Sequence, residues 1–191
     1  MIKSISGIRG TIGGSVGDSF TPIDIVKFTS AYAKFILDQN NTSKKIIVGR
    51  DARISGKFVS DLVCGTLVGC GFDVVDVGLS TTPTIEVSVQ REKASGGIIL
   101  TASHNPKQWN ALKLLNNKGE FISSKDGLKI LELAEKNDYH FSTIDKIGSL
   151  SYDNSQNNKH IEDVLNLNLV NIDLIKSKNF KVVVDAVNST G

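Results

Sequence analysis

The sequence has few of the residues that build disulfide frameworks or soft-metal sites. Two of its 191 residues are cysteine and three are histidine. Cys64 and Cys70 lie six positions apart among small and apolar residues, which favours two buried, reduced thiols. The histidines, at positions 104, 140 and 160, lack the spacing typical of a zinc site. The cysteines and histidines therefore predict neither a disulfide nor a structural zinc.

An excess of one charge is also lacking, as is any long hydrophobic run. The chain has 22 Lys+Arg against 20 Asp+Glu, a formal net charge of +2 with neither sign massed in one segment. This argues against a nucleic-acid partner. No apolar stretch approaches the roughly 20 residues that span a bilayer, and the first residues lack the apolar segment of a signal peptide. We expect a cytoplasmic globular protein without a membrane partner.

Short apolar segments alternate with helical patterns over most of the chain. The strands are expected at 45–49, 73–78 and 97–100, and the helices at 21–38, 56–70, 82–93 and from Ser123 or Ser124 to about 136. This alternation predicts right-handed β-α-β crossovers. A hairpin is expected from 111–115 and 120–123, joined by N-N-K-G. The fold class is therefore α/β, a three-layer α/β/α domain with a mixed, mainly parallel sheet.

A polar stretch from about 138 to 158 indicates a connection between two domains. We place the boundary near residue 145, so that 1–145 form the first domain. Residues 146–191 would then contain a linker and the truncated beginning of a second, similar domain. In that part we expect helices at 160–169 and around 174, and a strand at 181–185.

A serine and a histidine stand side by side in T-A-S-H-N-P, directly after the apolar segment 97–100. A serine hydrolase is not indicated, because G-x-S-x-G is absent and adjacent residues rarely reach the geometry of a catalytic triad. A loop hydroxyl can instead carry a phosphoryl group where cations neutralise the transferring oxygens. R-D-A-R follows strand 45–49, so a parallel sheet would bring both loops to one rim.

Five basic residues in or beside these loops could provide such cations: Arg9 in G-I-R-G, Arg50 and Arg53 in G-R-D-A-R, Lys107 directly after T-A-S-H-N-P, and Lys113 in W-N-A-L-K. Glycine lets a backbone approach a phosphate closely, although G-I-R-G-T-I-G-G matches neither the Rossmann nor the Walker pattern. Each basic residue could equally be a solvated surface charge. These residues alone are compatible with two interpretations, a phosphate-binding rim and an ordinary polar surface.

In this order, the motifs G-I-R-G, G-R-D-A-R-I-S-G and T-A-S-H-N-P, with Asn110 and Lys113 following, resemble the first domain of the α-D-phosphohexomutases. This family includes phosphoglucomutase, phosphomannomutase and phosphoglucosamine mutase. The resemblance covers residues 1 to 140, and V-V-V-D-A-V-N-S-T-G is similar to the first strand of the family's second domain. It implies an isomerase of carbohydrate metabolism that interconverts hexose 1-phosphates and 6-phosphates. The alternative is a non-catalytic module of the same fold that binds a phosphosugar or another partner.

The resemblance also implies roles for individual residues. Ser103 would be the phosphoserine that donates to a sugar phosphate, with a hexose 1,6-bisphosphate as intermediate and activator. Lys113 and Arg9 would supply acid–base and electrostatic catalysis, and His104 would contact the sugar or phosphate beside the carrier. Asn105 would shape the loop and bind substrate. These residues specify neither the hexose nor the oligomeric state.

For Arg50 and Arg53 two roles remain open: binding of substrate phosphate, or an ion-pair network with Asp51 under the serine loop. The family's Mg²⁺ is held by the phosphate on Ser103 and by three aspartates of a D-x-D-x-D loop, which this sequence lacks. The resemblance therefore implies an N-terminal fragment that is inactive alone. The sequence also departs from the family at Ala111, where many members have glycine.

Overall fold

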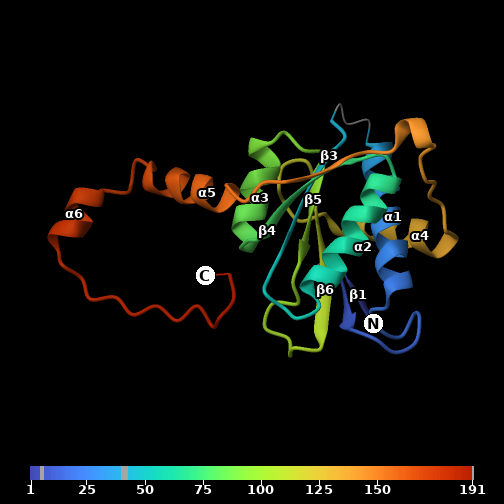
Figure 1. The fold of residues 1–191 in the computed structure, drawn as a ribbon, viewed down its shortest axis with the longest axis horizontal. Coiled ribbons are helices and arrows are strands. Elements are labelled where there is room, and N and C mark those ends of the chain that lie inside the picture. The colour runs from blue at the N-terminus through green and yellow to red at the C-terminus, as the bar shows by residue number, and fades with distance from the viewer. Residues whose placement is uncertain (5–6, 40–42, 191) are drawn as a thin grey trace.

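The computed structural model describes residues 1–4, 7–39 and 43–190, which form one mixed sheet with helices around it (Figure 1). The strands are β1 (Ile2–Ser4), β2 (Gly7–Thr11), β3 (Lys45–Arg50), β4 (Asp73–Leu79), β5 (Gly96–Leu100), β6 (Trp109–Leu115) and β7 (Leu150–Tyr152). The helices are α1 (Pro22–Asp38), α2 (Gly56–Gly69), α3 (Thr82–Arg91), α4 (Ser124–Lys136), the 3₁₀ turn η1 (Ile144–Lys146), α5 (Gln156–Leu165) and α6 (Ile172–Ser177).

The sheet has the strand order β1-β2-β6-β5-β3-β4-β7. β5, β3, β4 and β7 pair in parallel, whereas β1, β2, β6 and β5 pair antiparallel. The mixed sheet is confirmed, but parallel pairings do not outnumber antiparallel ones among the described strands. The difference arises because β1 and β2, which periodicity did not predict, extend the antiparallel side.

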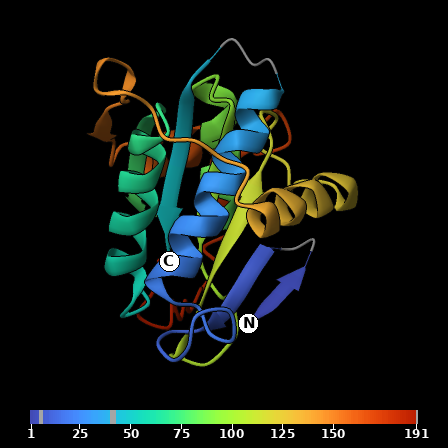
Figure 2. The ribbon, with the colours of Figure 1, turned by 90° about the vertical axis from the view of Figure 1, so that its right-hand side faces the viewer.

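Helices cover both faces of the sheet. α1, α2 and α4 bury their apolar sides against one face, in a core that includes Phe28, Leu67 and Ile98. α3 covers the other face, where Ile85 and Val89 pack against strand residues of a second core. Figure 2 shows α1, α2 and α4 in front of the strands, and Figure 1 shows α3 on the opposite side. The three-layer arrangement is therefore confirmed.

The start of α1 follows from local chemistry. Thr21 is the N-cap residue, and its side chain and that of Asp24 each accept a hydrogen bond from the other's backbone amide. Pro22 stands at the first helical position, where no hydrogen-bond donor is needed. The same kind of cap begins α4, where the hydroxyl of Ser123 accepts from the amide of Asp126.

Beyond residue 138 the structure differs from the expected linker. β7 pairs in parallel with β4, so the sheet continues past the boundary placed near 145. The boundary itself stays a prediction. α5 then packs on α3, which places the segment after β7 beside the first domain (Figure 1).

Two expected strands do not form. Residues 181–185 run as extended chain without a ladder, and the side chain of Val183 is 98% exposed. The prediction of a strand there was wrong for this structure, because none of the described strands lies beside it to complete its hydrogen bonds. Residues 120–123 contribute only an isolated bridge between Phe121 and Leu115, since the chain turns into the cap of α4 at Ser123.

Candidate active site

The serine loop lies at the carboxyl end of the sheet, as the sequence predicts. β5 and β3 are parallel neighbours, so the loop after Leu100 and the loop after Arg50 leave the same edge. The amide of Asp51 donates to the carbonyl of Leu100 at 3.1 Å, which ties the two loops together where they begin.

A cavity of about 170 Å³ opens beside the serine loop. Its lining consists of Arg9, Thr101, Ala102, Ser103, His104, Ala111 and Lys113. The strand register explains this grouping, because Arg9 on β2 stands opposite Ala111 on β6, and Lys113 follows two residues later on the same face. The structure therefore brings together all four residues expected to be catalytic. Asn105, Arg50 and Arg53 do not line this cavity.

Ser103 has an unusual backbone conformation. Its φ is 55°, in the left-handed region that residues other than glycine rarely adopt. The amide of Ser103 donates to Oγ1 of Thr101 at 3.0 Å, whereas its hydroxyl has no hydrogen-bond partner among the described residues. The residue is exposed, so the hydroxyl is available for chemistry at the mouth of the cavity.

Arg9 contributes an unsatisfied positive group. Its Nε is buried and has no acceptor within the part of the chain that the structure describes. A buried donor without a partner is costly, and more so when it belongs to a charged group. Because Arg9 lines the cavity, its positive charge favours an anion there.

Lys113 lies half-buried at the same cavity. Its ammonium is 5.9 Å from the centroid of the Phe121 ring, within the range of a cation–π contact. Burial raises the pKa of Glu86 above its ordinary value, and the positive charge of Lys113 partly offsets this effect. The cavity thus has two cationic side chains, Arg9 and Lys113, with a histidine at its exposed edge.

The guanidinium of Arg53 donates hydrogen bonds to backbone carbonyls of the serine loop. Nη1 donates to the carbonyls of Pro106 (2.8 Å) and Trp109 (3.0 Å), and Nη2 donates to those of Ser103 (2.8 Å) and Asn105 (2.7 Å). Nε donates to Oδ2 of Asp51 at 3.1 Å. All five donors of the guanidinium are therefore used. A contact with substrate phosphate would require one of these bonds to break, so the geometry favours the structural alternative.

Arg50 and Asn105 take different positions. Nη1 of Arg50 donates to the carbonyl of Asp51 at 3.2 Å, at the start of the loop. The amide of Asn105 donates to the carbonyl of Ala102 at 3.1 Å, and its side-chain Oδ1 is buried without a partner among the described residues. The binding roles of both residues stay predictions.

Sequence reasoning assigned no role to two polar residues near the serine loop. Thr101 lines the cavity, and its hydroxyl donates to Oδ2 of Asp51 at 2.6 Å. Asn110, which is fully buried, donates from Nδ2 to the hydroxyl of Ser55 at 2.9 Å and so joins β6 to the start of α2. Thr101 opens the motif T-A-S-H-N-P and Asn110 precedes Lys113 by three residues, but their partners Asp51 and Ser55 are not apparent from the sequence.

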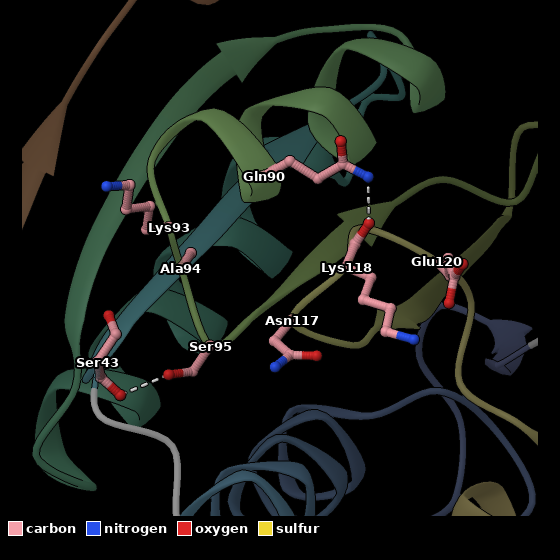
Figure 3. Close-up of a pocket in the computed structure, with 8 residues that line it drawn as sticks. All are labelled: Ser43, Gln90, Lys93, Ala94, Ser95, Asn117, Lys118 and Glu120. Atoms are coloured by element: carbon pink, nitrogen blue, oxygen red, sulfur yellow. Dashed lines mark hydrogen bonds between the residues drawn. The ribbon is translucent and has the colours of Figure 1, made fainter.

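A larger hollow of about 520 Å³ lies at the opposite end of the sheet (Figure 3). It is lined by Ser43, Gln90, Lys93, Ala94, Ser95, Asn117, Lys118 and Glu120. Nε2 of Gln90 donates to the carbonyl of Lys118 at 2.6 Å, which closes one side of it. None of the predicted site residues lies there, so its size does not make it the better candidate.

Metal-binding clusters and membrane-spanning helices are both lacking among the described residues. No group of three or more histidine, cysteine, aspartate or glutamate side chains is placed to hold a metal ion there. Both cysteines are free and buried, as expected. Within the same residues, no helix has the length and apolar character required to cross a membrane.

The fold and the site together define a class: an α/β/α domain that presents an exposed serine at the carboxyl ends of its parallel strands, at a cavity that Arg9 and Lys113 also line. The sequence profile of phosphoglucomutase/phosphomannomutase, alpha/beta/alpha domain I, matches residues 2–141. The chain belongs to this family.

Curated relatives agree with this assignment. The chain is 32% identical over 184 residues to a phosphoglucomutase/phosphomannomutase of Thermococcus kodakarensis, covering 95% of this chain and 40% of that protein. It is 33% identical over 186 residues to a phosphoglucosamine/phosphogalactosamine mutase of Sulfurisphaera tokodaii, covering 95% and 39%. The chain thus spans about two fifths of the length of these relatives.

A solved structure supports the fold. The crystal structure of a phosphoglucomutase/phosphomannomutase family protein from Burkholderia thailandensis superposes with a TM-score of 0.71. The match covers 84% of this chain and 34% of that one, at 21% identity.

Proposed function

We propose that this chain is the phosphoserine-bearing part of a cytoplasmic phosphohexose mutase, which interconverts a hexose 1-phosphate and a hexose 6-phosphate. The observation that carries the proposal is the cavity that Ser103 shares with Arg9 and Lys113, together with the Nε of Arg9, which is buried without a partner among the described residues. A site that only needed a stable surface would not hold a charged donor without an acceptor.

In the proposed reaction, Ser103 enters the cycle as a phosphoserine. The bond between its Oγ and phosphorus breaks as a hydroxyl oxygen of the hexose monophosphate bonds to that phosphorus, and the hydroxyl proton leaves. The hexose 1,6-bisphosphate then turns in the site and returns its other phosphoryl group to Oγ of Ser103. The sugar oxygen released in this step takes up a proton, so the net change is an isomerisation.

The side chains around Ser103 match the needs of this transfer. Lys113 in its neutral form would take the proton from the attacking hydroxyl, and the resulting ammonium would return it to the leaving oxygen. Arg9 would neutralise charge that develops on the transferring phosphoryl oxygens, where a fixed cation is worth more than in water. His104, exposed at the rim, would contact the sugar or its phosphate, and Asn105 would keep the loop in place.

This chain provides few ligands for the Mg²⁺ that the family resemblance implies. An oxygen of the phosphate on Ser103 is the one ligand that we assign here, because the described residues contain no carboxylate cluster. The chain spans only about two fifths of its relatives, and we propose that it is inactive by itself.

A non-catalytic module that binds phosphosugars is the second candidate. Arg9 and Lys113 would serve it equally well, but a binding site has no need of a serine hydroxyl exposed at the same cavity. The exposed Ser103, in its left-handed conformation, therefore favours the enzyme.

The test is phosphorylation and turnover in the complete protein that contains this chain. Intact mass after incubation with a hexose 1,6-bisphosphate should show one added phosphoryl group, located at Ser103 by peptide mapping. Ser103→Ala should remove both that mass and the conversion of hexose 1-phosphate to 6-phosphate. A Ser103→Ala protein with near-normal turnover would disprove the role, and binding of a hexose phosphate without turnover would favour the module.

A further inference from the structure

We propose that Arg53 is a positioning residue, which holds Ser103 in the left-handed conformation that presents its hydroxyl to the cavity. This inference rests on the proposed function for its effect on turnover. The loop geometry can be measured without any turnover, so the positioning role of Arg53 and the proposed function can fail separately.

Backbone carbonyls of the serine loop converge on the guanidinium of Arg53. Four loop residues, Ser103, Asn105, Pro106 and Trp109, direct their carbonyl oxygens at Arg53, at distances between 2.7 and 3.0 Å. Four carbonyl dipoles that point inward repel one another unless a positive group lies between them. The side chain of Arg53 is only 11% exposed, so water cannot readily take its place.

A chain of hydrogen bonds also leads from Arg53 back to the amide of Ser103. Asp51 accepts from Nε of Arg53 at 3.1 Å, and from the Arg53 amide at 3.0 Å. The same carboxylate accepts from Oγ1 of Thr101 at 2.6 Å, and Oγ1 accepts from the amide of Ser103 at 3.0 Å. Ser103 is thus held on both sides, at its amide through Thr101 and at its carbonyl through Arg53.

These bonds maintain an unusual backbone conformation of Ser103. At a φ of 55°, Ser103 occupies a region in which a side chain crowds the following carbonyl. Such a conformation persists only where the surroundings impose it. Without the bond from Arg53 to its carbonyl, Ser103 would relax toward negative φ and its hydroxyl would turn away from Arg9 and Lys113.

The arrangement requires arginine in particular. A guanidinium is planar and has five donors in a fixed fork, whereas a lysine ammonium has three donors on one atom. Lysine at position 53 would keep the charge, but it could not reach four carbonyls and Asp51 together. Charge alone is therefore not sufficient for this role.

The loop is tested first, by hydrogen exchange of backbone amides in the unsubstituted chain, Arg53→Lys, Thr101→Val and the control Lys57→Ala. Lys57 lies four residues after Arg53, and its side chain is 71% exposed. In Arg53→Lys we expect the amides of Ser103 and Asn105 to exchange about tenfold faster or more, with amides of β3 and β5 unchanged. Thr101→Val should accelerate Ser103 in the same way, and Lys57→Ala should change neither.

Either of two results would overturn the proposal at this stage. Unchanged exchange at Ser103 and Asn105 in Arg53→Lys would show that the loop does not need the guanidinium. Equal acceleration across β3 and β5 would show that Arg53 supports the fold as a whole and has no particular role in the loop.

Turnover is tested second, in the complete protein. Because Arg53 does not line the cavity, Arg53→Lys should lower kcat about 10- to 100-fold and change KM less than about threefold. Millimolar guanidinium should restore part of the kcat of Arg53→Ala and none of that of Ser103→Ala. A raised KM with unchanged kcat would overturn positioning in favour of a substrate contact. If the unsubstituted protein showed no mutase activity, the proposed function would fail while the exchange result still judged the role of Arg53.

Discussion

Oε1 of Gln156 accepts a hydrogen bond from Nη1 of Arg91 at 2.7 Å, and this contact joins α5 to the end of α3. The same oxygen accepts from the hydroxyl of Ser88 at 3.1 Å. Nε2 of Gln156 donates to Glu92 at 3.0 Å and to Asp153 at 2.8 Å. The side chain is fully buried, and its two acceptor and two donor positions are all used. Such a network specifies one docking position for α5.

We therefore predict that Gln156→Ala weakens the docking of α5 by about 1–3 kcal/mol, because it leaves buried polar groups such as the hydroxyl of Ser88 without a partner. Hydrogen exchange of the α5 amides and urea unfolding would measure the loss. Asn158→Ala is the control, since Asn158 is exposed on the same helix. Equal stability of the two variants would show that the network does not hold α5.

The pH dependence of stability should reflect two carboxylates near this network. Hydrogen bonds from Ser155 hold the pKa of Asp153 well below its ordinary value, with further contributions from Gln156 and Lys159. The hydrogen bond from Lys45 lowers the pKa of Glu92. A lowered folded-state pKa adds stability above the unfolded pKa of about 4, which is lost as the pH falls through the folded value.

We accordingly expect urea midpoints to fall below about pH 4, and to fall less steeply in Asp153→Asn than in the unsubstituted chain. At pH 7 the variant should be the less stable of the two. Asp145→Asn, at an exposed position in η1, should keep the original pH dependence. If Asp153→Asn kept it as well, Asp153 would not be the responsible group.

The two cysteines should be unreactive in the folded chain. Burial raises the pKa of Cys64 to about 12 and that of Cys70 to about 11, so almost no thiolate exists near neutral pH. Titration with a thiol reagent at pH 8 should detect neither sulfur until denaturant is added, and both afterwards. Rapid labelling of either thiol without denaturant would contradict the buried position of that cysteine.

In the complete protein, Arg9→Met and Lys113→Met should each lower kcat, by about 100-fold or more. Arg9→Met removes a cation from the phosphoryl site, and Lys113→Met removes the proton acceptor. Lys118→Met removes the same charge at an exposed position beyond the far end of β6, and it should retain full turnover. A parallel loss in all three variants would point to net charge as the cause.

Much of the architecture could be predicted because it depends on neighbouring residues. The caps at Thr21 and Ser123 and the alternation of apolar strands with helices are local patterns, and they predicted α1 to α4 and β3 to β5. The topology of parallel strands then placed the loop of Ser103 beside that of Arg53. The chemistry of a serine among cations was visible from the same segments.

The tertiary structure decided which of these residues face the cavity. Arg9 reaches it because β2 pairs with β6 in a register that sets Arg9 opposite Ala111, and β2 carries no periodic signal of its own. From the sequence, Arg53 could be either a phosphate ligand or a structural residue. In the structure its Nη1 and Nη2 donate to loop carbonyls, and no sequence pattern reveals these contacts. By itself the sequence determined α1 to α4 and β3 to β5, and it predicted Ser103 as the reacting group. The strand register and the direction of each cation were decided by contacts between residues far apart in the chain, whose energies depend on three-dimensional geometry.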